Sequence, residues 1–299
     1  MEKKLVSYCL ICYNQEQYIR EAVTAALEQT YSPLEIIISD DCSTDSTFEI
    51  ARRIAESYKG PHRIILNRNE KNLGIGGHVS KVLYSIASGD YLITLGGDDV
   101  SWKNHVENAV SYLEKYNDVP MIDFCADVIG PEGRMIGEIS MPFAARKYTL
   151  RDYLLLRRIR PFAPGRIFRK TLVSLFDPIP AECPTEDTVI VGRSLLLGGF
   201  YRVNATLVHY RKHGSNITNA DAYAGISQLR IMEQLRRDGT RFCEYGFITR
   251  RTYRLLMERI DFEYRMRKVK FYSGIPVHYF FKRVFIKILK YIHLIRISI

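Results

Sequence analysis

The sequence has no apolar run that approaches the roughly 18 residues needed to span a bilayer as a helix. Its beginning, MEKKLVSYCLICYNQ, has too short an apolar stretch for a secretory signal peptide, and no small-residue cleavage site follows it. These absences predict a cytoplasmic protein that is either soluble or bound to a membrane surface.

Cysteine is sparse, and no second CxxC accompanies the one formed by Cys9 and Cys12. That pair falls inside an expected strand, where residues three apart face opposite ways, so the two thiols would not converge on a metal. We therefore expect the six cysteines to be structural thiols in a reducing compartment.

Acidic residues are absent after Tyr264, whereas nine Lys and Arg residues follow it. Of the net charge of +10, only +1 is therefore left for the first 263 residues. Residues 277–297 place Arg283, Lys287 and Lys290 on one helical side and large apolar residues mainly on the other. This pattern predicts a basic amphipathic helix that binds an anionic membrane surface. The alternative is a terminal helix that packs its apolar side on the main domain.

Short apolar segments alternate with amphipathic segments through the first part of the chain. The expected strands cover 6–12, 34–39, 63–66 and 91–95, and the expected helices cover 17–29, 45–58, 78–88 and 103–116. Because these strands are apolar on both faces, we expect an α/β fold with a mostly parallel sheet and helices on both sides. A loop is expected over 67–77, a helix over 188–197, a strand over 201–210, and helices from 222 to the end with a break at 273–276.

The pair Asp98-Asp99 comes after an apolar strand and two glycines. Ligands of open α/β sheets bind beyond the carboxyl ends of the strands. Two adjacent carboxylates there can hold a divalent cation, which in turn binds phosphate oxygens. An exposed acidic turn is the alternative, and Gly-Asp-Asp also occurs in polymerases.

Tyr13 and the pair Asp40-Asp41 follow the first and second strands. An aspartate there can accept hydrogen bonds from a nucleobase N–H or from ribose hydroxyls, and a tyrosine ring can cover a nucleobase. The alternatives are ordinary packing of Tyr13 at the sheet edge and an acidic pair at a helix N-terminus.

Glu186 and Asp187 precede an expected helix. Asp187 could be a general base that deprotonates an attacking hydroxyl, or it could simply cap the helix. Because a helix N-terminus stabilises a carboxylate, Asp187 is expected to be ionised. His213, in an expected loop, could bind metal or phosphate or be merely solvated.

Taken in order, these segments resemble family 2 glycosyltransferases. The segments that carry the resemblance are LICYNQEQYIREAVTAALEQTY, LEIIISDDCSTDST, Asn72-Leu73-Gly74, SGDYLITLGGDD, TEDTVI and YRKHGSNIT, over roughly residues 3–220. The resemblance implies a GT-A fold, which is Rossmann-like with a mostly parallel central sheet. It also implies a GT-A domain over 1–220, with a nucleotide-sugar-binding half (1–119) and an acceptor-binding half (120–220). Residues 221–299 would form a C-terminal helical region with the basic tail.

The resemblance also implies roles for individual residues. Asp187 would be the catalytic base with Glu186 beside it, and Asp99 and His213 would ligate Mn²⁺ or Mg²⁺. The donor nucleotide sugar would be bound by Tyr13, Asn14, Asp40, Asp41, Asn72, Gly74, Lys81, Asp98 and Arg211. Asp98 would face the ribose or the sugar, and Arg211 the diphosphate.

Two positions depart from the family pattern. Gly97 stands where an acidic residue often precedes the metal pair, so Asp98 is expected to carry more of the ribose contact. Lys81-Val82-Leu83 stands where the family often has Asn-x-Gly, and this lysine could reach a phosphate or lie on the surface.

The predicted function is inverting transfer of a sugar from a nucleotide-diphosphate donor, by resemblance a UDP-sugar, to a hydroxyl of a glycan or lipid-linked saccharide. Such a reaction belongs to bacterial-type surface polysaccharide synthesis on the inner face of the plasma membrane. A nucleotidyltransferase with the same metal-bound diphosphate chemistry is the alternative. No nucleic-acid partner is expected, because the carboxylates would repel phosphate unless a metal intervened. No glycine-rich turn follows the first strand, which argues against a Rossmann dehydrogenase.

Overall fold

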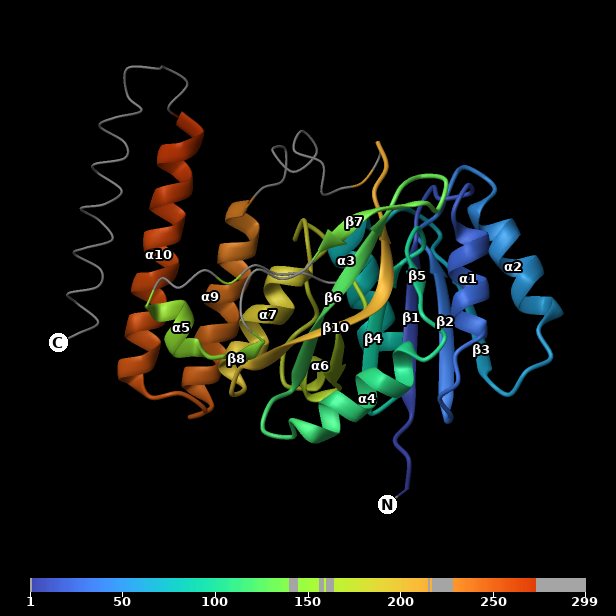
Figure 1. Cartoon of the computed structure of the whole chain (residues 1–299). Helices are drawn as coiled ribbons and strands as arrows, with labels where there is room; N and C mark the ends of the chain where they lie inside the picture. Colours follow the sequence, from blue (N-terminus) through green and yellow to red (C-terminus); the bar gives the residue numbers. More distant parts are fainter. Residues whose placement is uncertain are drawn as a thin grey trace.

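Ten strands form one curved sheet in the order β3-β2-β1-β4-β9-β6-β10-β5, with β7 beside β6 and β8 beside β10 (Figure 1). The computed structural model describes residues 2–139, 145–155, 159, 164–214, 216 and 228–272. Within these ranges, no helix is both long and apolar enough to cross a membrane.

The first part of the sheet is parallel and alternates with helices. Its strands are β1 (Val6–Cys12), β2 (Leu34–Asp40), β3 (Arg63–Arg68) and β4 (Tyr91–Gly96). Every residue of β1 and β2 is buried, as expected for strands covered on both faces. The intervening helices are α1 (Ile19–Leu27), α2 (Thr47–Ser57), α3 (Gly74–Lys81) and α4 (His105–Lys115).

The second part of the sheet mixes parallel and antiparallel pairs. Its strands are β5 (Val100–Ser101), β6 (Met121–Ile129), β7 (Met135–Ile139), β8 (Arg146–Tyr148), β9 (Ile167–Arg169) and β10 (Phe200–Arg211). Here β6 and β10 are parallel, whereas β9 lies antiparallel between β4 and β6. The three residues of β9 thus join the two parts into one sheet.

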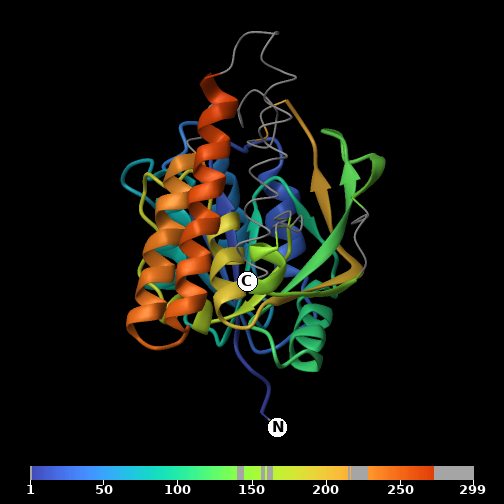
Figure 2. The same ribbon diagram turned by 90° about the vertical axis from the view of Figure 1, so that its left-hand side faces the viewer.

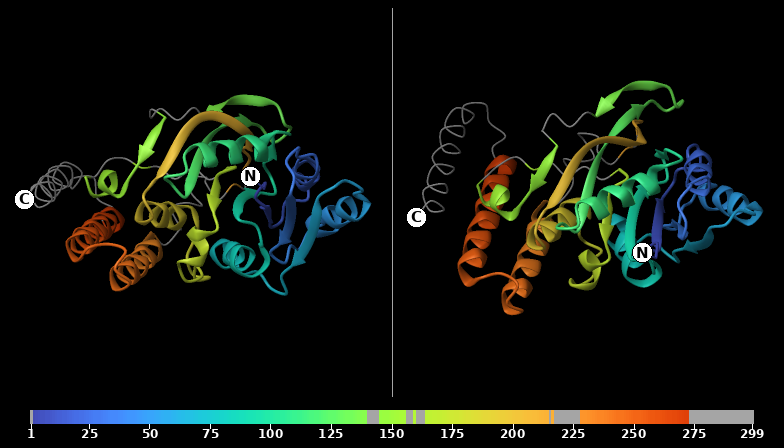
Figure 3. Two further views of the ribbon diagram at one scale, coloured as in Figure 1. Left: turned by 90° about the horizontal axis from the view of Figure 1, so that it is seen from below. Right: turned by 60° about the horizontal axis from the view of Figure 1, so that its bottom comes forward.

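Helices cover both sides of this sheet (Figure 3). Residues of α1, α2 and α4 build one apolar core with Cys12 of β1, and residues of α3, α6 (Thr171–Ser174) and α7 (Asp187–Leu196) build the other with Cys9. The prediction of an α/β fold with helices on both sides is therefore confirmed, as is the prediction that Cys9 and Cys12 face opposite ways. The sheet is mixed rather than mostly parallel, because β5, β7, β8 and β9 all pair antiparallel with their neighbours. All six cysteines are free.

The C-terminal helices α9 (Gln228–Glu244) and α10 (Arg250–Tyr272) lie side by side and pack against the second core (Figure 2). A short helix, α5 (Leu150–Leu154), also contacts α10. A Cβ on Gly192 of α7 would lie 2.1 Å from Leu235 Cδ2, so this glycine permits the close crossing of α7 and α9. Arg193 and Asp238 form a buried ion pair at the same crossing, with Nε 2.8 Å from Oδ2.

Some expected boundaries were wrong. The loop predicted over 67–77 is partly helical: α3 starts at Gly74, and a π-helical turn over Val82–Ile86 extends it. A Cβ on Gly76 would lie 2.2 Å from the Cys183 carbonyl oxygen, so the glycines that suggested a loop allow helix packing instead.

The helical segment expected without interruption from 222 to 273 is broken between Glu244 and Arg250. Gly246, with φ +75, ends α9 in the left-handed conformation that glycine favours after a helix. Strands β6 to β9 were not predicted at all. The expected break at 273–276 and the basic helix over 277–297 lie outside the described residues.

Candidate active site

The carboxyl ends of β1, β2 and β4 meet at one edge of the sheet. The Asp41 amide donates to the Cys12 carbonyl at 2.9 Å, and the Gly97 amide donates to the Ile11 carbonyl at 2.9 Å. The turns that follow β2 and β4 are therefore fixed to the end of β1. The polar residues expected from the sequence do lie together at this edge.

Asp98 contacts His213, which lies 115 positions later in the chain. The Asp98 Oδ2 atom lies 2.9 Å from His213 Nε2 and 3.4 Å from Asn216 Nδ2, and the last two atoms are 3.2 Å apart. The His213 ring also packs against Tyr18, with 4.7 Å between the ring centroids. The sequence placed His213 near the acidic pair, but the structure joins it to Asp98 rather than to Asp99.

Asp99 is held by the backbone of β10. Its Oδ1 accepts a hydrogen bond of 2.9 Å from the Arg211 amide, and the residue is only 5% exposed. Burial raises the pKa of this carboxyl well above its ordinary value, and the negative charge of Asp98 raises it further. A cation beside Asp98 and Asp99 would favour the ionised carboxylates and so lower the pKa of Asp99.

Arg211 is fully buried and shapes the turn around this acidic pair. Its guanidinium donates to the Asp98 carbonyl at 2.9 Å, to the Pro131 carbonyl at 2.9 Å and to Glu21 Oε2 at 2.7 Å. We expected this side chain to contact a donor diphosphate. In the structure its guanidinium is instead engaged by these three protein oxygen atoms.

Gly97 has no space for the acidic residue that the family often places there. A Cβ at this position would lie 2.6 Å from Gln15 Oε1 and 2.9 Å from Cys12 Sγ. An acidic side chain at this position would require Gln15 and Cys12 to shift.

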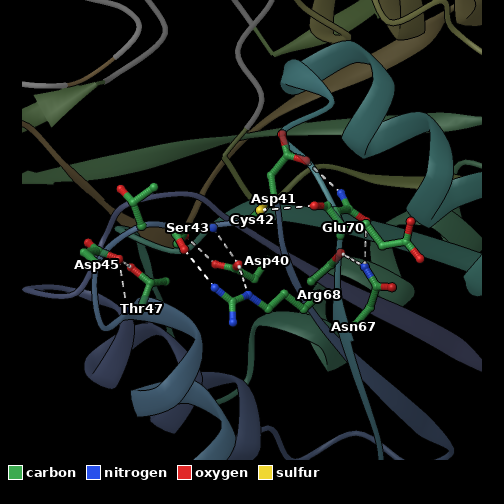
Figure 4. A network of polar contacts seen from close by, with 12 residues as sticks. Asp40, Asp41, Cys42, Ser43, Asp45, Thr47, Asn67, Arg68 and Glu70 are labelled. Carbon is green, nitrogen blue, oxygen red and sulfur yellow. Dashed lines mark hydrogen bonds and ion pairs between the residues drawn. The ribbon is translucent and has the colours of Figure 1, made fainter.

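Asp40 and Asp41 have different surroundings, and Figure 4 shows their side chains pointing apart. Asp40 stabilises its own turn, because its carboxylate accepts from the Ser43 amide at 2.8 Å and lies 3.7 Å from Arg68 Nε. Asp41 Oδ1 accepts from Asn69 Nδ2 at 2.7 Å and from the Leu73 amide at 2.9 Å.

The other expected donor-binding residues surround these two. Lys81 Nζ donates to Asn69 Oδ1 at 2.7 Å, which links it to Asp41 through one side chain. Asn14 and Asn72 accept backbone amides within the loops, from Thr44 and Gly74 respectively, each at 2.9 Å. Gly74 has φ +71, and Tyr13 is 45% exposed.

Glu186 and Asp187 lie at the start of α7 beside a buried arginine. Arg166 NH1 is 3.5 Å from Asp187 Oδ1, and Arg166 Nε donates to Asp123 Oδ1 at 3.0 Å. Arg202 NH2 contacts the other oxygen of Asp123 at 2.9 Å. Asp123, Arg166 and Arg202 were not expected from the sequence. The only signal was that Asp123 interrupts the apolar segment MIDFCADVI.

Glu186 is the residue before α7 and Asp187 is its first residue, so their carboxyl groups influence each other's protonation. Burial and the neighbouring Asp187 charge raise the pKa of Glu186 to about 8. Burial also raises the pKa of Asp187, although the positive charge of Arg166 opposes this. Burial thus outweighs the helix N-terminus on which the sequence argument relied. Both carboxyl groups therefore hold a proton more tightly than usual.

The donor atoms near Asp98 suit a hard divalent cation. Carboxylate oxygens and an imidazole nitrogen are ligands that Mn²⁺ accepts, and Mg²⁺ prefers the oxygens. Among the described residues, no three His, Cys, Asp or Glu side chains are grouped closely enough to form a metal site. Asp98, Asp99 and His213 thus have the ligand chemistry for a cation, but their side chains do not converge as a ready-made three-ligand site.

The fold and its polar edge define a GT-A glycosyltransferase. A solved structure of Staphylococcus aureus TarS (residues 1–349) in complex with UDP-GlcNAc superposes with a TM-score of 0.62, covering 85% of this chain and 71% of that one at 18% identity. The mannosyltransferase PcManGT of Pyrobaculum calidifontis, in complex with GDP-Man and Mn²⁺, superposes with a TM-score of 0.53, covering 99% of this chain and 86% of that one at 15% identity.

The sequence comparisons identify the family. The profile of Glycosyl transferase family 2 matches residues 7–171, and the chain belongs to this family. An uncharacterized protein of Mycobacterium tuberculosis is 32% identical over 215 residues, which are 71% of this chain and 60% of that protein. The poly(ribitol-phosphate) β-N-acetylglucosaminyltransferase TarS of S. aureus is 29% identical over 216 residues, which are 70% of this chain and 36% of TarS. The chain thus spans only part of the length of these relatives.

Proposed function

We propose that this glycosyltransferase moves a sugar, with inversion, from a UDP-sugar to a hydroxyl of a glycan or lipid-linked saccharide in surface polysaccharide synthesis. The observation that carries the proposal is the contact of Asp98 with His213, next to the buried Asp99, at the sheet edge where Asp41 follows β2. The UDP-GlcNAc and GDP-Man complexes of the structural neighbours support a nucleotide-sugar donor. We propose 1–119 as the donor half, 120–220 as the acceptor half and 221–299 as a C-terminal extension.

The donor nucleotide would bind between the ends of β1 and β2. Asp41 Oδ1 is occupied by the loop that follows β3, which leaves Oδ2 to accept a nucleobase N–H. The half-exposed ring of Tyr13 would cover the base. Asp40, Asn14, Asn72 and Gly74 would act by fixing the loops, and Lys81 would place a positive charge near the diphosphate.

Asp98, Asp99 and His213 would hold the divalent cation, with Asp98 beside the ribose. When bound, the cation would stabilise the negative charge of the leaving diphosphate as a Lewis acid. Arg211 would orient the site through its amide and its contact with the Asp98 carbonyl, rather than bind the donor itself.

Asp187 would accept the proton of the attacking hydroxyl as the bond between the sugar and the diphosphate breaks. A single displacement of this kind inverts the anomeric carbon and needs one base. A raised pKa suits the role, because a base works best when its pKa approaches the operating pH. Glu186, whose pKa is raised to about 8, would stay protonated beside it, and Arg166 would fix the orientation of Asp187.

The test is hydrolysis of a panel of nucleotide sugars with Mn²⁺, Mg²⁺ or a chelator, for the native protein and for Asp99→Ala. We expect one donor class to be hydrolysed and both the chelator and the substitution to abolish the reaction. Asp118→Asn, at an exposed ion pair with Lys147, is the matched control and should behave as native. Activity that survives both treatments would reject metal dependence, and pyrophosphate release from nucleoside triphosphates would point to the nucleotidyltransferase alternative.

Asp187→Asn tests the base in the same assays. Donor affinity, measured by UDP calorimetry, should stay unchanged, while transfer to an acceptor should fall by about 10²- to 10⁴-fold. Unchanged transfer would remove Asp187 as the base.

A further inference from the structure

Four side chains form a row across the strands next to the candidate active site. Trp102 follows β5, His209 lies on β10, Asp127 on β6 and Glu138 on β7. In the strand register, His209 is directly opposite Asp127 and Asp127 is directly opposite Glu138. Residues that are directly opposite share one face of a sheet. We call these four residues the Trp102 row; Figure 1 shows their strands β5, β10, β6 and β7 together.

The row is exposed at its two ends, at Trp102 and Glu138, whereas Asp127 between them is buried. Trp102 is 38% exposed, and its ring lies 5.9 Å from the ring of His209. His209 Nδ1 is 3.3 Å from Asp127 Oδ2, without the alignment of a hydrogen bond. Within the described part of the chain, Asp127 makes no other ion pair. Glu138 is exposed. The row therefore offers an aromatic face at one end and the exposed carboxylate of Glu138 at the other to a ligand.

The row lies beside the acidic pair. Arg211, whose amide binds Asp99, is two residues beyond His209 on β10, which is about 7 Å along a strand. Trp102 is three residues beyond Asp99 in the chain. A ligand on the row thus reaches the end of the sheet where Asp98 and Asp99 lie.

The row also shares a face with the candidate base. Asp123 and Asp127 are four residues apart on β6 and point the same way, since the irregularities of the β6–β10 pair lie on β10. Asp123 binds Arg166, and Arg166 contacts Asp187. A ligand on the Trp102 row and the carboxylate of Asp187 are therefore on the same side of the sheet.

We propose that the Trp102 row is a subsite for an oligosaccharide acceptor, an inference that rests on the proposed transferase function. The indole ring would stack on the C–H face of one sugar ring, and the exposed carboxylate of Glu138 would accept hydrogen bonds from hydroxyls of another. The row crosses four neighbouring strands, a distance of roughly 14 Å, which is longer than one sugar ring.

The test uses the full chain on an array of immobilised oligosaccharides, in the presence of UDP. The native protein is compared with Trp102→Ala, Trp102→Phe and the control Tyr245→Ala, which removes an exposed aromatic residue outside the row. We expect the native protein and Tyr245→Ala to retain a defined subset of glycans. Trp102→Ala should lose affinity for them by about tenfold, and Trp102→Phe should recover part of it. Retention of no glycan, or equal retention by Trp102→Ala, overturns the proposal.

Fluorescence provides a second readout, because Trp102 is the only tryptophan of the chain. The glycan best retained on the array should shift the tryptophan emission to shorter wavelength and protect it from acrylamide quenching. Binding with no change in emission would place the saccharide elsewhere.

Donor hydrolysis separates this proposal from the function on which it rests. Trp102→Ala should hydrolyse the donor at the native rate and lose only acceptor-dependent transfer, as a higher KM for the acceptor. If the native protein hydrolyses no nucleotide sugar, the proposed function fails, whereas the array result still decides the saccharide subsite.

Discussion

At the scale of single residues, the carboxyl pair at the start of α7 makes stability depend on pH. Burial and the neighbouring charge of Asp187 raise the pKa of Glu186 from its ordinary value of 4.5 to about 8. The folded state therefore binds this proton more tightly than the unfolded chain. The stability from this group is complete below about pH 4.5 and is lost as the pH rises to about 8.

Glu186→Gln should remove this dependence, because the amide stays neutral and can still donate to Asp187. Urea unfolding from about pH 5 to about pH 8 should show a free energy of unfolding that falls more steeply for the native protein than for the variant. Glu132→Gln, on the exposed turn between β6 and β7, should follow the native slope. If the free energy of unfolding falls equally with pH in the native protein and in Glu186→Gln, the pKa of Glu186 is not raised in the folded state.

Which residues gather in the candidate site was largely predictable, but their contacts were not. Polar residues after buried parallel strands must meet at one edge, so Asp41, Asp98 and Asp99 could be placed from the sequence. The partner of His213 depends on how β10 ends, 115 positions away from Asp98. Arg166 and Asp123 are 43 positions apart and belong to no motif.

At the scale of elements, the crossing of α7 and α9 attaches the C-terminal helices to the rest of the protein. Arg193 donates to both oxygens of Asp238, and neither side chain is more than 3% exposed. Burial raises the pKa of Asp238, and the positive charge of Arg193 opposes this. A buried charge that loses its partner is costly.

Asp238→Asn should therefore lower the free energy of unfolding by about 3–5 kcal/mol, measured by urea denaturation. The matched control is Asp261→Asn, which removes the exposed ion pair between α10 and Arg236. It should cost less than about 1 kcal/mol. Equal effects of the two substitutions would mean that the buried pair does not hold α9 in place.

The length and the apolar character of a strand explain whether it could be predicted from the sequence. Strands β1 to β4 are continuous apolar segments between helices, so pattern alone located them, and β1 was predicted at its observed boundaries. Strand β9 has only three residues, and its place is set by β4 and β6 on either side. Such a strand has no periodicity of its own.

At the scale of the whole molecule, the net positive charge is concentrated in the last part of the sequence. The sequence assigns nine of the ten net charges to the chain after Tyr264. We propose that this segment binds the anionic inner face of the plasma membrane, where a lipid-linked acceptor would be found.

A chain that ends near Gly274 should therefore pellet with anionic liposomes much less than the full chain, while both remain in solution with neutral liposomes. Raising the salt concentration should release the full chain, because part of the attraction is electrostatic. Equal pelleting of the two proteins would exclude the tail as the membrane contact. Donor hydrolysis by the truncated chain serves as the control for folding.

The hydrogen bond between Asp99 and the Arg211 amide also bears on the order in which the protein is made. Its two ends are 112 positions apart. During translation the N-terminal strands can pair as they emerge, but the turn that carries Asp98 and Asp99 must wait for β10. A nascent or prematurely terminated chain that stops before residue 211 would therefore have the parallel strands without the complete site. Such a chain would not consume the activated sugars of the cell.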